Sequence, residues 1–238
     1  MTLTPPGQAF LPEAVAILKR ANLGVERARA AATGIIGRLM IGFVDNALWG
    51  VLPPVLHRFQ IEHPLVKLKL KQMARTVQVD QLRDLTIDIG VLPSSLPPAR
   101  ELDTFVLASS PLLAAMPKEH PLGSHSKVAL RNLAQEPFVL SPPRMHNRML
   151  EIVIDGCASA GFIPQISQGA EQLHTMIALT RAGLGITFVP RLVAQTYSTV
   201  LSYVPLSDPL PPYELLVVWH RDHSNPAVKQ FCAAAAAR

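Results

Sequence analysis

Small polar residues recur where a predicted strand gives way to a predicted helix. Such a junction leaves backbone N–H groups unpaired at the helix N-terminus, and in an open α/β sheet it lies at the edge where ligands bind. The first junction follows the predicted strand 39–44 and carries Asp45 and Asn46. The later junctions carry Thr76, Ser141 with Arg144, and Gly169 with Ala170. Each alone is an ordinary cap or turn, but their recurrence predicts a shared site for a small polar molecule.

Residues for catalysis or metal binding are scarce. The sequence has no GxSxG, HExxH, Walker or dinucleotide-binding motif. Its eight histidines lie mostly beside prolines or at the ends of predicted elements, and none has metal-ligand spacing to a carboxylate or cysteine. Cys157 and Cys232 follow neither metal nor redox spacing, and we interpret them as buried residues of a reducing compartment. We therefore expect neither enzyme activity nor a cofactor or metal.

The composition is that of a folded chain. Hydrophobic residues make up 49% and charged residues 16% of 238 residues, enough for one large domain or two small ones. Neither a signal peptide nor an apolar run of about 18 residues is seen, so we expect a cytoplasmic protein without membrane contact. Residues 1–38 carry five basic and two acidic side chains, a net charge of +3. That excess fits either a nearby polyanion or a solvated helix face.

The first part of the chain is predicted to form a long helix, followed by strands and helices that alternate as in a doubly wound α/β sheet. The segment 12–32 is rich in helix formers, and its apolar positions follow a heptad seam that predicts pairing with a second copy or packing on its own domain. Strands 39–44, 66–71 and 87–92 alternate with helices 47–62 and 78–85, which predicts a parallel sheet. The seam residues are Leu11, Val15, Leu18, Asn22, Val25, Arg29 and Ala32.

The second half repeats the pattern, with a short additional helix at 191–196. Strands 137–140, 164–168 and 186–189 alternate with helices 148–160 and 172–182, and Gly183 is expected to end the second of these helices. Apolar strands 105–108 and 111–116 precede this half, and we expect the chain to cross between lobes near 111–118. A strand at 214–220 should cross back, before a final helix at 227–238. Two lobes with two crossings predict a hinged receptor whose helix N-termini face one cleft.

Several segments resemble the LysR-type transcriptional regulators. LTPPGQAFLPEA (3–14) is similar to the end of that family's winged helix-turn-helix and the start of its linker helix. GRLMIGFV, EHPLVKLKL and DQLRDLTIDIGVL are similar to the start of its effector domain, KEHPL (118–122) to its His-Pro-Leu turn, and AGLGITFVP (182–190) to its late helix–strand signature.

The resemblance implies an α/β fold of two Rossmann-like lobes, of the periplasmic-binding-protein type II, preceded by a long linker helix. The implied domains are the end of the wing and the linker helix (1–37), lobe I (38–110 with 221–238) and lobe II (111–220). It also implies a homodimer or homotetramer built through the linker helix and lobe I. DNA contact would be made only by the helix-turn-helix, of which the last residues are present here.

The resemblance further implies a small-molecule inducer in the cleft. The most similar regulators control the breakdown of aromatic compounds, and their inducers are often small carboxylates. The expected inducer is therefore a small polar metabolite, such as an aromatic or a dicarboxylic acid. A hydroxyl residue usually stands where this chain has Asp45. That carboxylate would repel an anion unless Arg144 or Arg75 offsets it, or it caps its helix and faces away. The implied contacts are Asp45, Asn46, Thr76, Val77, Ser141, Pro142, Arg144, Asn147, Met149, Gly169 and Ala170.

Two other classes of protein share such a scaffold. A solute-binding receptor of a transporter would need an export signal and leaves the linker helix without a role. An enzyme would need a nucleophile or an acid–base pair in the cleft, and the sequence indicates neither.

Overall fold

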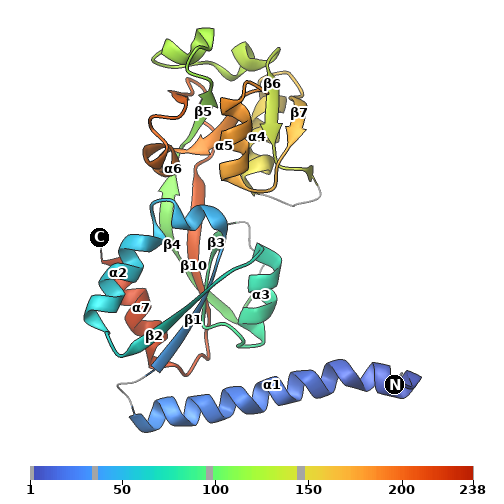
Figure 1. The fold of residues 1–238 in the computed structure, drawn as a ribbon, viewed down its shortest axis with the longest axis vertical. Helices are drawn as coiled ribbons and strands as arrows, with labels where there is room; N and C mark the ends of the chain where they lie inside the picture. Colours follow the sequence, from blue (N-terminus) through green and yellow to red (C-terminus); the bar gives the residue numbers. More distant parts are fainter. Residues whose placement is uncertain (1–2, 34–36, 95–98, 144–147, 238) are drawn as a thin grey trace.

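The computed structural model describes residues 3–33, 37–94, 99–143 and 148–237. A long helix, α1 (Pro5–Thr33), precedes two α/β lobes that are stacked along the long axis of the molecule (Figure 1). Helix α1 begins seven residues earlier than the expected segment 12–32, since Pro5 suits the first helical turn. It continues through Pro12 at the cost of one backbone hydrogen bond.

Lobe I is built on a five-stranded sheet of order β2-β1-β3-β10-β4. Strand β1 is parallel to β2 and β3, and β10 is antiparallel to β3 and β4. Helices α2 and α7 cover one face and α3 the other (Figure 1). The strands are β1 (Gly37–Phe43), β2 (Val66–Gln72), β3 (Ile89–Pro93), β4 (Leu102–Ser110) and β10 (Tyr213–His220), and the helices are α2 (Leu52–Glu62), α3 (Arg75–Arg83) and α7 (Pro226–Ala236).

Lobe II repeats this strand arrangement in two hydrogen-bonded pieces, β8-β5-β9 and β6-β7. The N–H of Val139 donates to the carbonyl of Ile186 at 2.8 Å, which joins the two pieces through β6 and β8. The resulting order, β7-β6-β8-β5-β9, matches that of lobe I. The strands are β5 (Leu112–Met116), β6 (Pro137–Leu140), β7 (Gln165–Gly169), β8 (Thr187–Pro190) and β9 (Ser202–Pro205), and the helices are α4 (Arg148–Ser159), α5 (Leu173–Arg181) and α6 (Arg191–Thr196).

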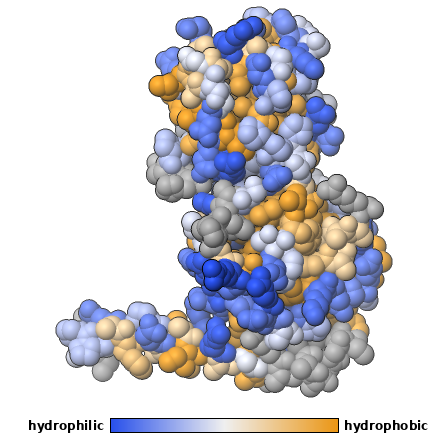
Figure 2. All heavy atoms as spheres, turned by 180° about the vertical axis from the view of Figure 1, so that it is seen from behind, coloured by the Kyte–Doolittle hydropathy of each residue, from blue (hydrophilic) through white to orange (hydrophobic). Residues whose placement is uncertain are grey.

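Two strand passages connect the lobes. The chain leaves lobe I at the end of β4 and enters lobe II through β5, and it returns at Tyr213 through β10. The strand predicted at 214–220 to cross back is therefore confirmed. Seen from behind, the molecule narrows where the lobes meet, and α1 projects from the base of lobe I (Figure 2).

The helix expected at 47–62 is wrong in its first part. Asp45–Leu48 form a 3-10 turn, η1, and α2 starts only at Leu52. The chain breaks at Gly50, whose φ of +143° is open to glycine but strained for other residues. The prolines of the first turn of α2 have no N–H to pair, so a new helix starts there without loss.

Three further expectations need correction. Helix α3 begins at Arg75 rather than at residue 78, so Thr76 and Val77 belong to its first turn and not to a loop. Leu70 lies on the apolar side of the alternating segment 66–71 and was expected to be buried. It is 45% exposed, because β2 is an edge strand with a neighbouring strand on one side. Strand β9 was not predicted, because four residues of mixed polarity carry no periodic signal.

None of the helices in the described ranges combines the length and the hydropathy that a bilayer span requires.

Candidate ligand-binding site

A cavity of about 430 Å³ lies between the two lobes. It is bounded by the carboxyl ends of β1, β2 and β3 in lobe I and by the starts of α4 and α5 in lobe II, where an open α/β sheet places its ligands. The lining residues are Val44, Asp45, Asn46, Gln72, Met73, Ala74, Arg75, Pro93, Arg148, Met149, Glu171, Gln172, Leu173, Met176 and Tyr213.

Asp45 stands at the cavity wall with one carboxylate oxygen engaged. The indole N–H of Trp49 donates to Oδ2 at 3.2 Å, which ties the side chain to its own 3-10 turn. The Nδ1 atom of His174, on α5 of lobe II, lies 3.5 Å from the same oxygen. Val44, and not Asp45, is the N-cap of this turn. The side chain of Asp45 is 18% exposed and lines the cavity, so it does not face away from the cleft.

Asn46 is held by the strand that returns from lobe II. Its Nδ2 donates to the hydroxyl of Tyr213 at 2.8 Å. Burial raises the pKa of Tyr213 from 10.0 to about 12, and the bond from Asn46 acts in the opposite direction. The Oδ1 atom of Asn46 is buried and has no hydrogen-bond partner among the residues that the structure describes. A buried unpaired acceptor costs about 1–3 kcal/mol, which a water molecule or a ligand would recover.

Gln78 fixes the connection between β2 and α3, which forms one side of the cavity. Its side chain is fully buried, and its Nε2 donates to the carbonyl of Met73 at 3.0 Å. It lies over Gly42 and Gly90, where an added Cβ atom would come within 3.2 and 3.1 Å of it. The two glycines of β1 and β3 therefore make room for the side chain that positions Met73 and the start of α3.

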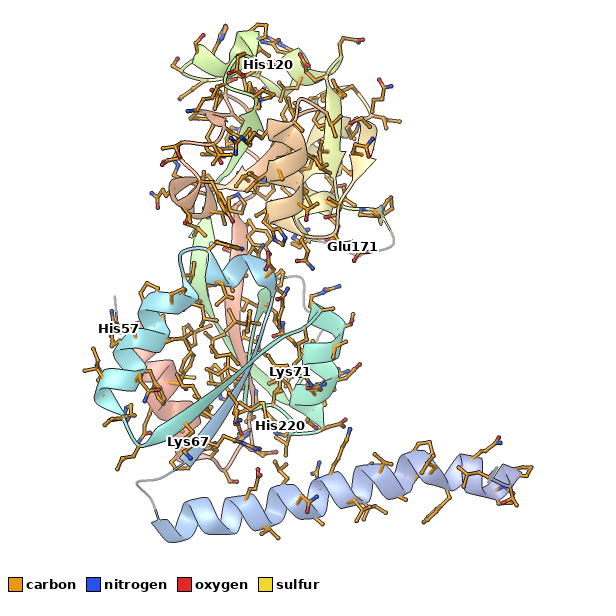
Figure 3. All side chains as sticks on the ribbon, viewed as in Figure 1. His57, Lys67, Lys71, His120, Glu171 and His220 are labelled. Atoms are coloured by element: carbon orange, nitrogen blue, oxygen red, sulfur yellow. The ribbon has the colours of Figure 1, made fainter. Side chains whose placement is uncertain are left out.

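Lobe II contributes the starts of two helices. Arg148 opens α4, and its Nη1 lies 3.3 Å from the carboxylate of Glu151 one turn later. Gln172 precedes α5 without a side-chain cap, as Ala74 precedes α3 in lobe I. Glu171 lies at the edge of lobe II that faces lobe I (Figure 3). Two uncapped helix N-termini from opposite lobes thus meet one cavity, an arrangement that favours an anionic group.

Beside the cavity the lobes touch through α6. The rings of Trp49 and Tyr197 lie 5.2 Å apart, and the hydroxyl of Thr196 donates to the carbonyl of Trp49 at 3.3 Å. An added Cβ on Gly50 would lie 3.2 Å from the carbonyl oxygen of Leu192. The 3-10 turn that carries Asp45 is therefore packed against lobe II.

The structure brings some of the predicted contact residues together at this cavity. Asp45, Asn46 and Met149 line it. The side chains of Thr76 and Val77 are exposed on α3 and are absent from the described lining. Arg144 and Asn147 lie outside the described residues.

The remaining predicted residues are Ser141, Pro142, Gly169 and Ala170, near the ends of β6 and β7. Ser141 is buried at the end of β6, Gly169 lies against Pro142, and the N–H of Ala170 is already bonded to the carbonyl of Leu140. All four are absent from the described lining.

Sequence reasoning missed the residues that enter from a distance. Tyr213 is the first residue of β10, and Met73, Leu173 and Met176 form apolar parts of the wall. In the sequence these apolar residues have the spacing of ordinary core residues, and no local signal distinguishes a residue of the cavity wall from a core residue. Arg148 is the exception, since it adjoins the predicted junction after β6. Among the described residues there is no cluster of His, Cys, Asp and Glu that would hold a metal ion.

Solved structures share this fold. The LysR regulator CbnR superposes with a TM-score of 0.79 over 98% of this chain and 80% of that chain, at 24% identity, which establishes the fold alone. The effector-binding domain of BenM with its effector benzoate gives a TM-score of 0.74 at 25% identity, covering 83% of this chain and 90% of that one. The periplasmic-binding-protein-like arrangement of two lobes is thereby confirmed.

Sequence comparison gives the family. The regulator AlsR of Bacillus subtilis (strain 168) is 32% identical over 230 residues, covering 96% of this chain and 76% of that protein. CatR of Pseudomonas putida is 33% identical over 210 residues, covering 87% and 71%. These relatives are transcriptional regulators and lend no support to a transporter receptor. The LysR substrate binding domain family matches residues 32–238, and the chain therefore belongs to the LysR-type transcriptional regulators.

Proposed function

We propose that this chain is the sensing and oligomerisation part of a LysR-type regulator that binds a small carboxylic acid between its lobes. Occupancy would stabilise one arrangement of the lobes and of the subunits, and so change DNA binding and transcription. In this proposal residues 1–37 form the linker. The expected boundary at 220/221 moves to 212/213, because strand β10 pairs with β3 and β4, so 38–110 with 213–238 form lobe I and 111–212 form lobe II. DNA is contacted by the helix-turn-helix that precedes the linker in this family.

The observation that carries the proposal is the cavity of about 430 Å³. Two helices of nine residues, α3 and α5, point their uncapped N-termini at it from opposite lobes. Each N-terminus carries a partial positive charge, and Arg148 adds a full one beside them. A carboxylate held between these groups would attract both lobes at once, which is how ligand binding can favour closure.

The predicted contacts divide into four groups under this proposal. Asp45, Asn46 and Met149 contact the ligand directly, and Thr76 and Val77 act through backbone N–H groups in the first turn of α3. Ser141, Pro142, Gly169 and Ala170 shape the floor of lobe II behind the wall. Arg144 and Asn147 are proposed to complete the site from the segment between β6 and α4.

The named ligands of related structures support a carboxylate. The effector-binding domain of BenM was solved with benzoate, and that of QuiR with shikimate. Both molecules are small ring carboxylates, a size that suits the cavity. For assembly we propose a homodimer or homotetramer formed through α1 and lobe I, in the cytoplasm, where the DNA is.

Thermal unfolding with millimolar benzoate and shikimate tests the proposal. We expect at least one acid to raise the Tm in a concentration-dependent manner, because a ligand that binds only the folded state stabilises it. Arg148→Gln should lower the affinity for that acid about tenfold or more, because a hydrogen-bonded charge pair between ligand and chain is lost. Arg181→Gln, at the other end of α5, is the matched control and should bind like the unsubstituted chain. Equal affinities of both variants would contradict the placement of the carboxylate.

A further inference from the structure

The bonding of Asp45 leaves half of its carboxylate free at the cavity. Both contacts of the side chain, from the indole of Trp49 and from the ring of His174, fall on Oδ2. Oδ1 makes no hydrogen bond within the described part of the chain, although the side chain is only 18% exposed. A carboxylate oxygen can accept two hydrogen bonds and donate none. A molecule that fills the cavity must therefore offer Oδ1 a donor or leave it desolvated.

The charge of the described lining also limits the ligand. Asp45 and Glu171 carry negative charge, and Arg75 and Arg148 carry positive charge, so these four side chains sum to zero. A ligand with one carboxylate can lie near the helix N-termini and Arg148. A second carboxylate on the same ligand would meet no surplus of positive charge among these residues, and Asp45 would repel it at short range.

Local packing keeps Asp45 from moving out of the way. Its own turn is fixed to lobe II by the contact of Trp49 with Tyr197 and by the hydroxyl of Thr196. Rotating the carboxylate away would break the bond from Trp49 and leave that indole N–H without its partner. Because the acceptor is held in place, it selects among ligands instead of adapting to them.

On these observations, and resting on the proposed function, we propose that Asp45 is a specificity-determining residue that selects monocarboxylates carrying an N–H or O–H donor away from the carboxylate. A hydroxy acid or amino acid of the size of a ring carboxylate can place its carboxylate near the helix N-termini and Arg148 and its donor on Oδ1 of Asp45. Unsubstituted monocarboxylates leave Oδ1 desolvated, and dicarboxylates place a like charge against it.

Calorimetric titration of matched acids tests the proposal. One pair is shikimate and cyclohexene-1-carboxylate, which share a ring and differ in hydroxyl groups. The other set is benzoate, its three monohydroxy and three monoamino derivatives, and the three benzenedicarboxylates. We expect the tightest hydroxy or amino acid to bind about tenfold or more tightly than its unsubstituted parent, since a bond to a charged acceptor is gained. The dicarboxylates should bind more weakly than benzoate.

Variants of Asp45 separate selection from folding. In Asp45→Ser the affinities of the donor-bearing and unsubstituted acids should differ by no more than about threefold, because the negative charge is removed. For the same reason the variant should bind the dicarboxylates more tightly than the unsubstituted chain does. Asp45→Asn keeps an acceptor for Trp49, and its thermal unfolding shows whether the fold survives the loss of charge. Asp80→Asn, an exposed carboxylate on α3, is the control and should keep the preference of the unsubstituted chain.

The outcomes distinguish this inference from the proposed function. If no acid in either set binds, carboxylate sensing in the cavity is rejected and the inference with it. If acids bind but benzoate or the dicarboxylates bind as tightly as the donor-bearing acids, only the role of Asp45 is rejected. Retention of the preference in Asp45→Ser would reject it as well.

Discussion

The Oδ2 atom of Asp45 lies 3.5 Å from Nδ1 of His174, and this contact joins the η1 turn of lobe I to helix α5 of lobe II. The side chain of His174 is half exposed, and such surface pairs contribute about 0–1 kcal/mol to stability. The contact exists only while the lobes are close together. Its consequences should therefore appear in ligand affinity more than in global stability.

We expect His174→Ala to lower the free energy of unfolding by less than about 1 kcal/mol and to weaken ligand binding about threefold, because the closed arrangement loses one contact. Urea unfolding and calorimetric titration measure the two quantities. His125 is exposed and follows the 3-10 turn Pro121–Ser124 of lobe II, so His125→Ala is the control and should change neither quantity. A loss of stability well above 1 kcal/mol with unchanged affinity would show that the contact is structural only.

The two glycines of the turn before β8 should differ strongly in their tolerance of a side chain. Gly185 has a φ of +144°, and an added Cβ would collide with the carbonyl oxygen of Pro137. Gly183 has a φ of +80° and open space around it. We expect Gly185→Ala to cost about 3 kcal/mol or more through collision and strain, and Gly183→Ala about 1 kcal/mol through its backbone alone. Urea unfolding of both variants checks the ranking, and equal losses would refute it.

Ionisation of Tyr213 should weaken the fold at alkaline pH. Burial raises the pKa of its hydroxyl from 10.0 to about 12. The neutral form is therefore favoured in the folded state, and this contribution is fully present below pH 10 and lost as the pH rises to 12. Two pKa units correspond to about 3 kcal/mol.

Tyr213→Phe isolates that contribution. At pH 7 the variant should lose about 1 kcal/mol, because Nδ2 of Asn46 loses its acceptor. Between pH 10 and 11 its free energy of unfolding should fall less steeply than that of the unsubstituted chain. Urea unfolding at pH 7, 10 and 11 measures the difference, and parallel pH profiles of the two chains would contradict the assignment.

The heptad seam of α1 should govern self-association. Leu11, Val15, Leu18 and Val25 of the seam are 48%, 42%, 64% and 52% exposed, so the seam packs little on its own lobes. Figure 2 shows apolar side chains among the polar ones along this helix. We expect Leu18→Asp to weaken dimers about tenfold or more, since it places a charge in the seam.

Ile17→Asp provides a matched control for the seam. Ile17 is 62% exposed and lies one position off the seam, so it loses similar apolar area without entering a paired interface. Light scattering over a dilution series should show monomers at higher concentration for Leu18→Asp than for Ile17→Asp. Equal behaviour of the two variants, or a monomer at all concentrations for the unsubstituted chain, would contradict pairing through the seam.

Elements with strong local signals could be predicted from the sequence. Strand β6 and helix α6 have the bounds predicted for them. Pro137 is the first residue of β6 and Pro190 immediately precedes α6, so a proline marks the start of each element. Gly183 was predicted to end α5, and its positive φ places it in the turn that follows. Helix α2 was misjudged because the break at Gly50 depends on the close approach of Leu192 from the other lobe.

The site was only partly predictable, because part of it also depends on contacts between segments that are distant in the sequence. The residues at strand ends, such as Asp45 and Asn46, are marked by their polar types next to apolar runs, so the sequence alone determined that a junction stands there. Only the tertiary structure decided that His174 faces one oxygen of Asp45 and that Tyr213 holds Asn46. Those partners lie 129 and 167 residues away along the chain. Local preference acts over a few neighbouring residues, whereas a cleft forms only once strand order and lobe packing bring distant segments together.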